Sequence, residues 1–125
     1  MRVESGMSDL VAYVRRNHME VVNLEDNSVA QASGAFTTTR LLVGQFKVAE
    51  ALLTKLLKEV KSKGFFSAQP NLLLQPLEMI EGGLSEVEER VFLELGAGAG
   101  ARHVKVHIGP KLSPQAALEA LNARA

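Results

Sequence analysis

The spacing of apolar residues changes several times along this chain, and the order of those changes constrains its fold more than any other feature. The first third holds three short apolar segments, at residues 10–14, 18–24 and 28–34. Polar runs at residues 15–17 and 25–27 separate them and are typical of tight turns. Short strands joined by such turns predict an antiparallel meander. The third segment is small and polar, so we expect it at a sheet edge.

A helical spacing follows the meander. Apolar residues recur three and four positions apart, which predicts one apolar face of an amphipathic helix: Ala49, Leu52, Leu53, Leu56, Leu57 and Val60. Its other side carries lysines: Lys47, Lys55, Lys58, Lys61 and Lys63. Gly64 is placed to end this helix as a C-terminal cap.

The second half alternates strand and helix signals. The apolar run at residues 72–74 predicts a strand that is buried on both faces. Ser85 and Glu88 form a capping box, so a helix starts there, and we expect one face to carry Leu84, Val87, Val91 and Leu95. Apolar residues at 104, 106 and 108 alternate with polar ones and predict a half-exposed strand. Ser113 and Pro114 open a last helix that extends to about Asn122.

The predicted topology is therefore βββ-α-β-α-β-α, an α/β fold. A meander followed by two crossover units requires a mixed sheet with helices on both faces. We expect five strands in the order 3-2-1-4-5, which is the ribonuclease-H-like order. Residues 8–125 are expected to form one domain, because 125 residues suit a single core, and residues 1–7 a disordered N-terminal extension.

Composition narrows the function classes. The 14 basic and 14 acidic residues balance, which argues against a general nucleic-acid binder. The chain has no cysteine, so disulfides, thiolate zinc sites and a cysteine nucleophile are excluded. Neither a signal peptide nor a run of about 18 apolar residues is present, so a cytoplasmic protein is expected.

The segment GAGAGA at residues 96–101 loosely matches a dinucleotide-binding fingerprint. That fingerprint needs a strand before the glycines and a helix after them, so that helix N–H groups face the phosphates. Here the predicted helix runs into the glycines and the strand leaves them. We therefore interpret the segment as a helix end and a tight turn, whose carbonyl groups have the wrong polarity for phosphate.

Two stretches resemble the bacterial actin homologue MreB, the rod-shape-determining family. VEERVFLELGAGAGARHV resembles that family's helix–turn–strand, and VGQFKVAEALLTKLLKEVKSKGF resembles its first large helix. The resemblance covers about residues 41–110 and implies one ribonuclease-H-like, half-actin domain. The whole chain is also similar to small, functionally uncharacterised bacterial proteins of the YjaA type, which share RRN, F-x-V-A-E and EGGLS-x-VEER.

The MreB resemblance does not carry its ATPase residues over. Residues 13–16 stand where that family has its acidic phosphate loop, and Gly109 stands at its catalytic glutamate. We expect no second domain, which in that family completes the ATP site, because 125 residues leave no room for it. We therefore expect no enzyme, no ATP binding and no cofactor.

Three side-chain groups are candidate sites. Arg15, Arg16 and His18 lie where the phosphate loop would be and could bind an anion or a partner's acidic surface. A two-metal nuclease would need carboxylates to converge, and the available ones are Asp9, Glu50 and Glu78. His103 and His107 would lie about 13 Å apart on a strand, too far for one metal ion, so no metal site is expected.

These observations favour a non-catalytic, single-domain relative of actin-like ATPases that acts through protein contacts, with a protein partner or a second copy. Loss of the second domain exposes a surface for such contacts, and kinship alone links the chain to cell shape or the cytoskeleton. A small anion- or nucleotide-binding regulator that uses Arg15 and Arg16 is the first alternative, and a divergent metal-dependent nuclease is the second. Nucleic acid is not expected as a partner.

Overall fold

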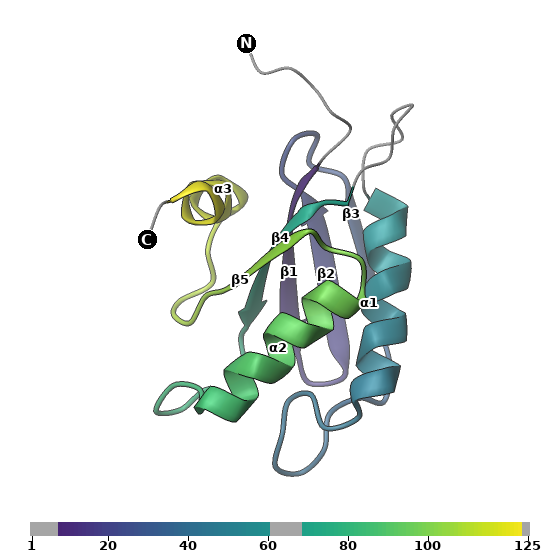
Figure 1. Cartoon of the computed structure of the whole chain (residues 1–125), viewed down its shortest axis with the longest axis vertical. Coiled ribbons are helices and arrows are strands. Elements are labelled where there is room, and N and C mark those ends of the chain that lie inside the picture. The colour runs from purple at the N-terminus through teal and green to yellow at the C-terminus, as the bar shows by residue number, and fades with distance from the viewer. Residues whose placement is uncertain (1–7, 61–68, 124–125) are drawn as a thin grey trace.

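A computed structural model describes residues 8–60 and 69–123, and their core is a five-stranded mixed sheet (Figure 1). The strands are β1 (Asp9–Arg15), β2 (His18–Asn23), β3 (Val29–Ser33), β4 (Asn71–Pro76) and β5 (His103–Val106). Their order is β3-β2-β1-β4-β5, with β1–β2 and β2–β3 antiparallel and β1–β4 and β4–β5 parallel. The strand order and topology predicted from the sequence are confirmed.

Helices cover both faces of the sheet, as predicted. Helices α1 (Phe46–Val60) and α2 (Glu86–Gly98) lie on one face, and α3 (Pro114–Asn122) lies on the other (Figure 1). The larger apolar core lies under α1 and α2. A smaller one under α3 consists of Val11, Tyr13, Val22, Leu73, Ala117 and Leu121.

The central strands are buried on both faces because helices pack against each side of them. Leu72, Leu73 and Leu74 are all at most 1% exposed, which confirms the prediction from the continuous apolar run. Strand β3 pairs only with β2 among the described residues, and its Val29 is 52% exposed. The predicted edge position of this third strand is therefore confirmed.

The second helix begins and ends at local sequence signals. The Ser85 hydroxyl accepts the Glu88 N–H, and the Glu88 carboxylate accepts the Ser85 N–H. At the other end Gly100 has a left-handed φ of 110°, its N–H donates to Ala97 O, and the Ala101 N–H donates to Gly96 O. This pattern is a Schellman motif, which ends a helix and satisfies its last carbonyls. GAGAGA is thus a helix end and turn, as the order of elements predicted.

The apolar face of α2 is buried only in part. Val87 is 73% exposed, and the buried residues of this helix are Phe92, Leu95 and Gly96. The reason is that the first half of α2 borders a pocket between loops, and its apolar side chains Val87 and Val91 face that pocket.

Predictions were also made for the ends of the helices, for the N-terminal residues and for membrane spans. The Gly64 cap, together with Lys61 and Lys63, lies outside the described residues, as does the expected extension at residues 1–7. Ser113 caps α3 at Pro114 as predicted. Among the described residues, each helix is too short or too polar to cross a membrane.

Two buried amides fix the connections to the sheet. The Asn23 side chain donates to Val60 O at 2.7 Å, so the last turn of α1 is held against β2. The Gln75 side chain is fully buried, donates to Gly109 O and Pro110 O, and accepts the Leu112 N–H. The segment that leads into α3 is thereby tied to β4.

Candidate functional site

Three connections meet where β1 and β4 end. These parallel strands have Val14 opposite Pro76, so the hairpin after β1 and the loop after β4 leave the sheet at the same end of the central strands. The loop between β3 and α1 also reaches this end, because Asn17 and Thr37 exchange hydrogen bonds of 2.9 Å. The carboxyl ends of parallel strands are the usual place for ligand sites in α/β sheets.

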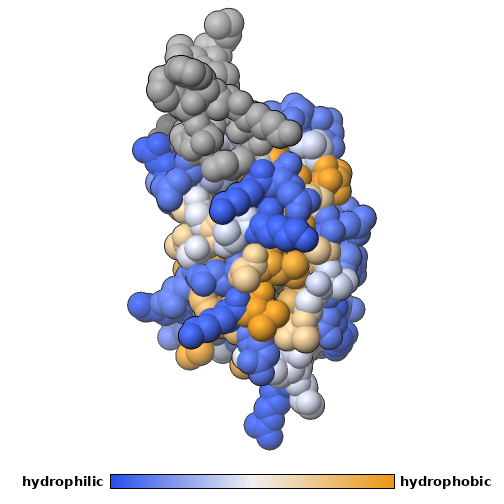
Figure 2. Space-filling view, turned by 90° about the vertical axis from the view of Figure 1, so that its right-hand side faces the viewer, coloured by the Kyte–Doolittle hydropathy of each residue, from blue (hydrophilic) through white to orange (hydrophobic). Residues whose placement is uncertain are grey.

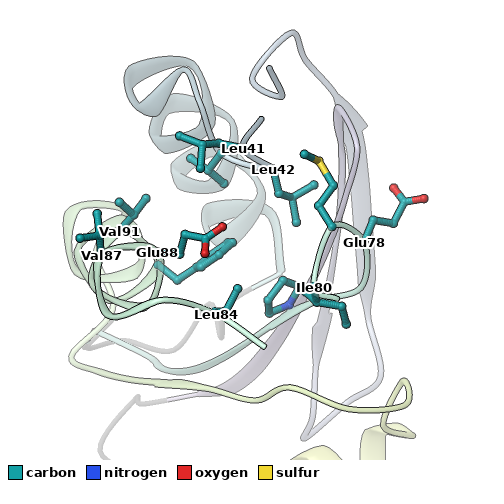
Figure 3. Close-up of a pocket in the computed structure, with 12 residues that line it drawn as sticks. Leu41, Leu42, Glu78, Ile80, Leu84, Val87, Glu88 and Val91 are labelled. Atoms are coloured by element: carbon teal, nitrogen blue, oxygen red, sulfur yellow. The ribbon is translucent and has the colours of Figure 1, made fainter. Parts of the chain in front are cut away.

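An apolar pocket opens between these loops and the first half of α2 (Figure 3). Its cavity volume is about 40 Å³. Two rim residues are strongly exposed, with Leu41 at 42% and Val87 at 73%. The side chains that shape it come from three separate segments: Leu41, Leu42, Met79, Leu84, Val87 and Phe92.

Met79, in the pocket wall, has a strained backbone. Its φ is 59°, in the left-handed region that side chains larger than Asn or Asp seldom occupy. Such a conformation costs on the order of 1–3 kcal/mol and is typically found at binding sites. The loop after β4 thus keeps a conformation that its own sequence does not favour.

The predicted cluster of Arg15, Arg16 and His18 is divided between two places. The Arg16 N–H donates to Glu78 Oε1 at 2.5 Å, and its guanidinium lies 3.3 Å from Glu78 Oε2. Arg15 and His18 are opposite each other on β1 and β2. The two His18 ring nitrogens lie 3.1 Å from Ser33 Oγ and 3.1 Å from Gln31 Oε1. Arg16 is thus paired with Glu78, which lines the pocket, whereas His18 is held against β3.

The carboxylates considered for a nuclease do not converge. Asp9 starts β1 and accepts a hydrogen bond from Asn71 at 3.0 Å, whereas Glu78 follows the far end of β4. Glu50 lies on α1, beside Gly98 at the end of α2. Among the residues the structure describes, no three His, Asp or Glu side chains are close enough to hold one metal ion.

A comparison with known proteins decides the family. No protein-family model matches the chain. It is 37% identical over 98 residues to the uncharacterized protein YjaA of Escherichia coli strain K12, which covers 74% of this chain and 77% of that protein. The chain belongs to the YjaA family. The sequence resemblance to YjaA is thereby confirmed, and the resemblance to MreB stays a prediction.

The pocket of this YjaA-family chain has an acidic rim. The loop after β4 and the first turn of α2 place Glu78 and Glu88 in its lining (Figure 3). Glu86 and Glu89 line a different depression on α2, together with Arg90 and Leu93. The opposite sign gathers on α1, where Lys47, Lys55 and Lys58 are exposed.

Sequence reasoning missed the pocket of this YjaA-family chain, because the pocket lies between loops rather than on one element. One signal could have indicated it. Leu41, Leu42 and Val43 form an apolar run in a segment without strand or helix periodicity, and Leu77, Met79 and Ile80 form another. Apolar residues in two separate loops indicate that the loops pack together or bind something apolar.

Proposed function

We propose that this YjaA-family chain is a non-catalytic domain that acts through protein contacts, and that its pocket binds an apolar anchor residue of a protein partner with basic residues beside it. The observation that carries the proposal is the exposed apolar pocket at the carboxyl ends of β1 and β4, with Leu41 and Val87 at its rim. Exposed apolar surface bordered by polar residues is typical of protein interaction sites.

The size of the pocket favours a side chain over a small molecule. Small-molecule and cofactor sites enclose about 300–1,000 Å³. The cavity volume of this pocket is about 40 Å³. A protruding Leu, Ile or Met of a partner can fill it, and the exposed Leu41 and Val87 extend the contact beyond the pocket.

The charge around the pocket specifies the flanking residues of the partner. The carboxylates of Glu78 and Glu88 line it. Lysine or arginine next to the anchor would complement these carboxylates, steer association and make its rate fall with salt. An acidic partner would be repelled by the same groups.

The non-catalytic part of the proposal is supported by the positions of the polar groups. Asp9 and Glu78 lie at opposite ends of the central strands, so they cannot act on one bond. The Arg16 guanidinium is paired with Glu78 rather than directed at an open site. The pocket itself is lined almost entirely by apolar side chains.

Kinship to actin-like ATPases is part of the proposal. The strand order β3-β2-β1-β4-β5 supports a ribonuclease-H-like assignment, and the MreB-like motifs support a half-actin domain. A link to cell shape or the cytoskeleton rests on that resemblance alone. The first alternative, an anion-binding regulator that uses Arg15 and Arg16, has less support because Glu78 already neutralises Arg16.

Photo-crosslinking in cells tests the proposal. Val87 and Leu93 lie on the same helix, but only Val87 borders the pocket, and Leu93 is 38% exposed. Each is replaced by benzoylphenylalanine in a chain expressed in Escherichia coli, and the cells are irradiated. We expect a covalent adduct with one protein at position 87 and none at position 93, with the captured segment apolar and basic.

A second variant makes the result specific. Leu41→Asp places a charge at the rim of the pocket on an exposed loop residue, so the fold should persist, as circular dichroism would show. We expect it to suppress the adduct at position 87. Equal adducts at both positions, no adduct, or an adduct that Leu41→Asp leaves unchanged would each contradict the proposal.

A further inference from the structure

The open edge of β3 presents a set of backbone groups that suits another strand. The Asn23 N–H donates to Ser28 O, and the Gly34 N–H donates to Asn17 O. Hydrogen-bonded pairs alternate along an antiparallel ladder, so Ala30 and Ala32 also bond to β2. The backbone groups of the residues between them therefore point away from β2: Val29, Gln31 and Ser33. Within residues 8–60 and 69–123, β3 has no strand on that side.

Among the described residues, this edge shows no charged side chain, proline or bulge that would prevent strand pairing. Natural edge strands are protected by charged side chains, proline, bulges or a covering element. The sequence of β3 is VAQAS, without charge or proline, and its register with β2 is continuous. A strand with these properties is expected to be covered in the working molecule.

Apolar surface continues from the edge onto α1. A β-carbon on Gly34 would lie 3.4 Å from Leu52 and 3.7 Å from Val48, so both side chains border the end of β3. Val48 is 42% exposed, and Ala51 beside it is exposed as well. Figure 2 looks onto the α1 side of the molecule, where apolar side chains form a patch among hydrophilic ones.

We propose that the occupant is a second copy of this chain, which pairs its own β3 antiparallel to this one with Gln31 on the two-fold axis. The sequence supports this register because it is nearly symmetric about Gln31. The axis places Ala30 opposite Ala32 of the second copy and Val29 opposite Ser33. Gln31, Val29 and Ser33 then exchange backbone hydrogen bonds across the axis, and the two sheets form one continuous sheet.

Small side chains and charge are both compatible with this pairing. Ala30 and Ala32 form the close, non-hydrogen-bonded pairs, where side chains from facing strands approach most tightly. They lie on the α1 side of the sheet, because both pack into the core under α1 and α2. The chain has no net charge, so two copies do not repel each other at long range.

Sedimentation tests the assembly. We expect the wild-type chain to sediment with twice its mass of 13.5 kDa. Gln31→Lys places two like charges against each other at the axis and should give a monomer with an unchanged circular dichroism spectrum. Ala97→Lys adds the same charge to an exposed site on α2 and should remain dimeric. A monomeric wild type, or a Gln31→Lys dimer, would overturn the proposal.

Disulfide trapping tests the register, and the absence of native cysteine makes single-cysteine variants unambiguous. Residues opposite each other in a hydrogen-bonded pair have Cα atoms about 5.5 Å apart, within the range of about 4.4–6.8 Å that a disulfide spans. Gln31→Cys should therefore form a disulfide with its own copy under mild oxidation. Ser33→Cys is the matched control, since both residues contact His18, and its copies would lie about 13 Å apart.

The proposed axis also predicts a mixed disulfide. Val29→Cys and Ser33→Cys chains, mixed before oxidation, should crosslink with each other more than either does with itself. Ser33→Cys self-crosslinking as fast as Gln31→Cys would overturn the register. If the chain is monomeric and binds a strand of another protein at the β3 edge, that protein is the partner at this edge, and the proposal of a second copy is wrong.

Discussion

Tyr13 is the only tyrosine in the chain, and its phenol is held in a specific environment. The side chain is 3% exposed, and its hydroxyl donates to Leu112 O at 2.7 Å. The Lys111 ammonium lies 4.5 Å from the ring centroid and 3.6 Å from Glu20. Burial raises the pKa of the Tyr13 phenol above its usual value, and the nearby Glu20 carboxylate raises it further.

We predict that Tyr13 contributes to stability below about pH 10, the ordinary pKa of tyrosine. Because the folded-state pKa is raised, this contribution is lost as the pH rises from there through the folded pKa. Tyr13→Phe should lose about 1 kcal/mol with the hydrogen bond at neutral pH and show a smaller alkaline decline. Urea unfolding at several pH values measures both effects, and an absorbance titration of the single phenol should give a midpoint above that in urea.

Residue-level features were predictable where they are local. The capping box links Ser85 to Glu88 three positions later, so its pattern is visible in the sequence. The Gln75 amide instead bonds to groups 34 to 37 positions away, and the Asn23 amide bonds to one 37 positions away. No local pattern could indicate these, because the fold creates the partners.

Helix α2 approaches the sheet closely at Gly96. A β-carbon there would lie 2.7 Å and 2.8 Å from the two methyl carbons of Val104 and 3.3 Å from Leu74. A β-carbon on Gly98, two positions later, would meet only the flexible end of Glu50, which can move into solvent. The two glycines therefore differ in what they allow, although both belong to GAGAGA.

We predict that Gly96→Ala destabilises the fold by about 1–3 kcal/mol, because it forces α2 away from β5. Gly98→Ala should be neutral or stabilising by up to about 1 kcal/mol, since alanine favours a helix more than glycine does. Urea unfolding of both variants measures the difference. Val104→Ala should rescue part of the Gly96→Ala loss, and equal effects of both substitutions would contradict this account of the packing.

Elements were predictable from periodicity, but the use of their surfaces was not. The apolar face predicted for α1 is buried at Ala49, Leu53 and Leu56, because the sheet covers most of that face. On α2 Val87 belongs to the predicted apolar face together with Leu95, but Val87 is exposed whereas Leu95 is buried. Periodicity shows which side of a helix is apolar, and it does not show whether the core or an open pocket lies beside it.

At the scale of the whole molecule, connectivity determined the sheet and left the candidate site undefined. Right-handed crossovers and short turns leave few orders for a chain with this sequence of elements, so β3-β2-β1-β4-β5 followed. The pocket depends on how three loops pack against one another at one edge. Loop conformations such as the left-handed Met79 have no reliable sequence signal.

Nucleotide binding would change the stability of the whole chain. A ligand at 100 times its dissociation constant stabilises a folded protein by about 2.7 kcal/mol, which raises the midpoint of thermal unfolding by several degrees. We expect no such shift with ATP and Mg²⁺, because the pocket offers about 40 Å³ and Arg16 is paired with Glu78. Glu78→Gln removes the carboxylate that pairs with the Arg16 guanidinium, and it is measured beside the wild type as the matched variant. A wild-type shift that Arg15→Ser or Arg16→Ser abolishes would instead favour the anion-binding regulator.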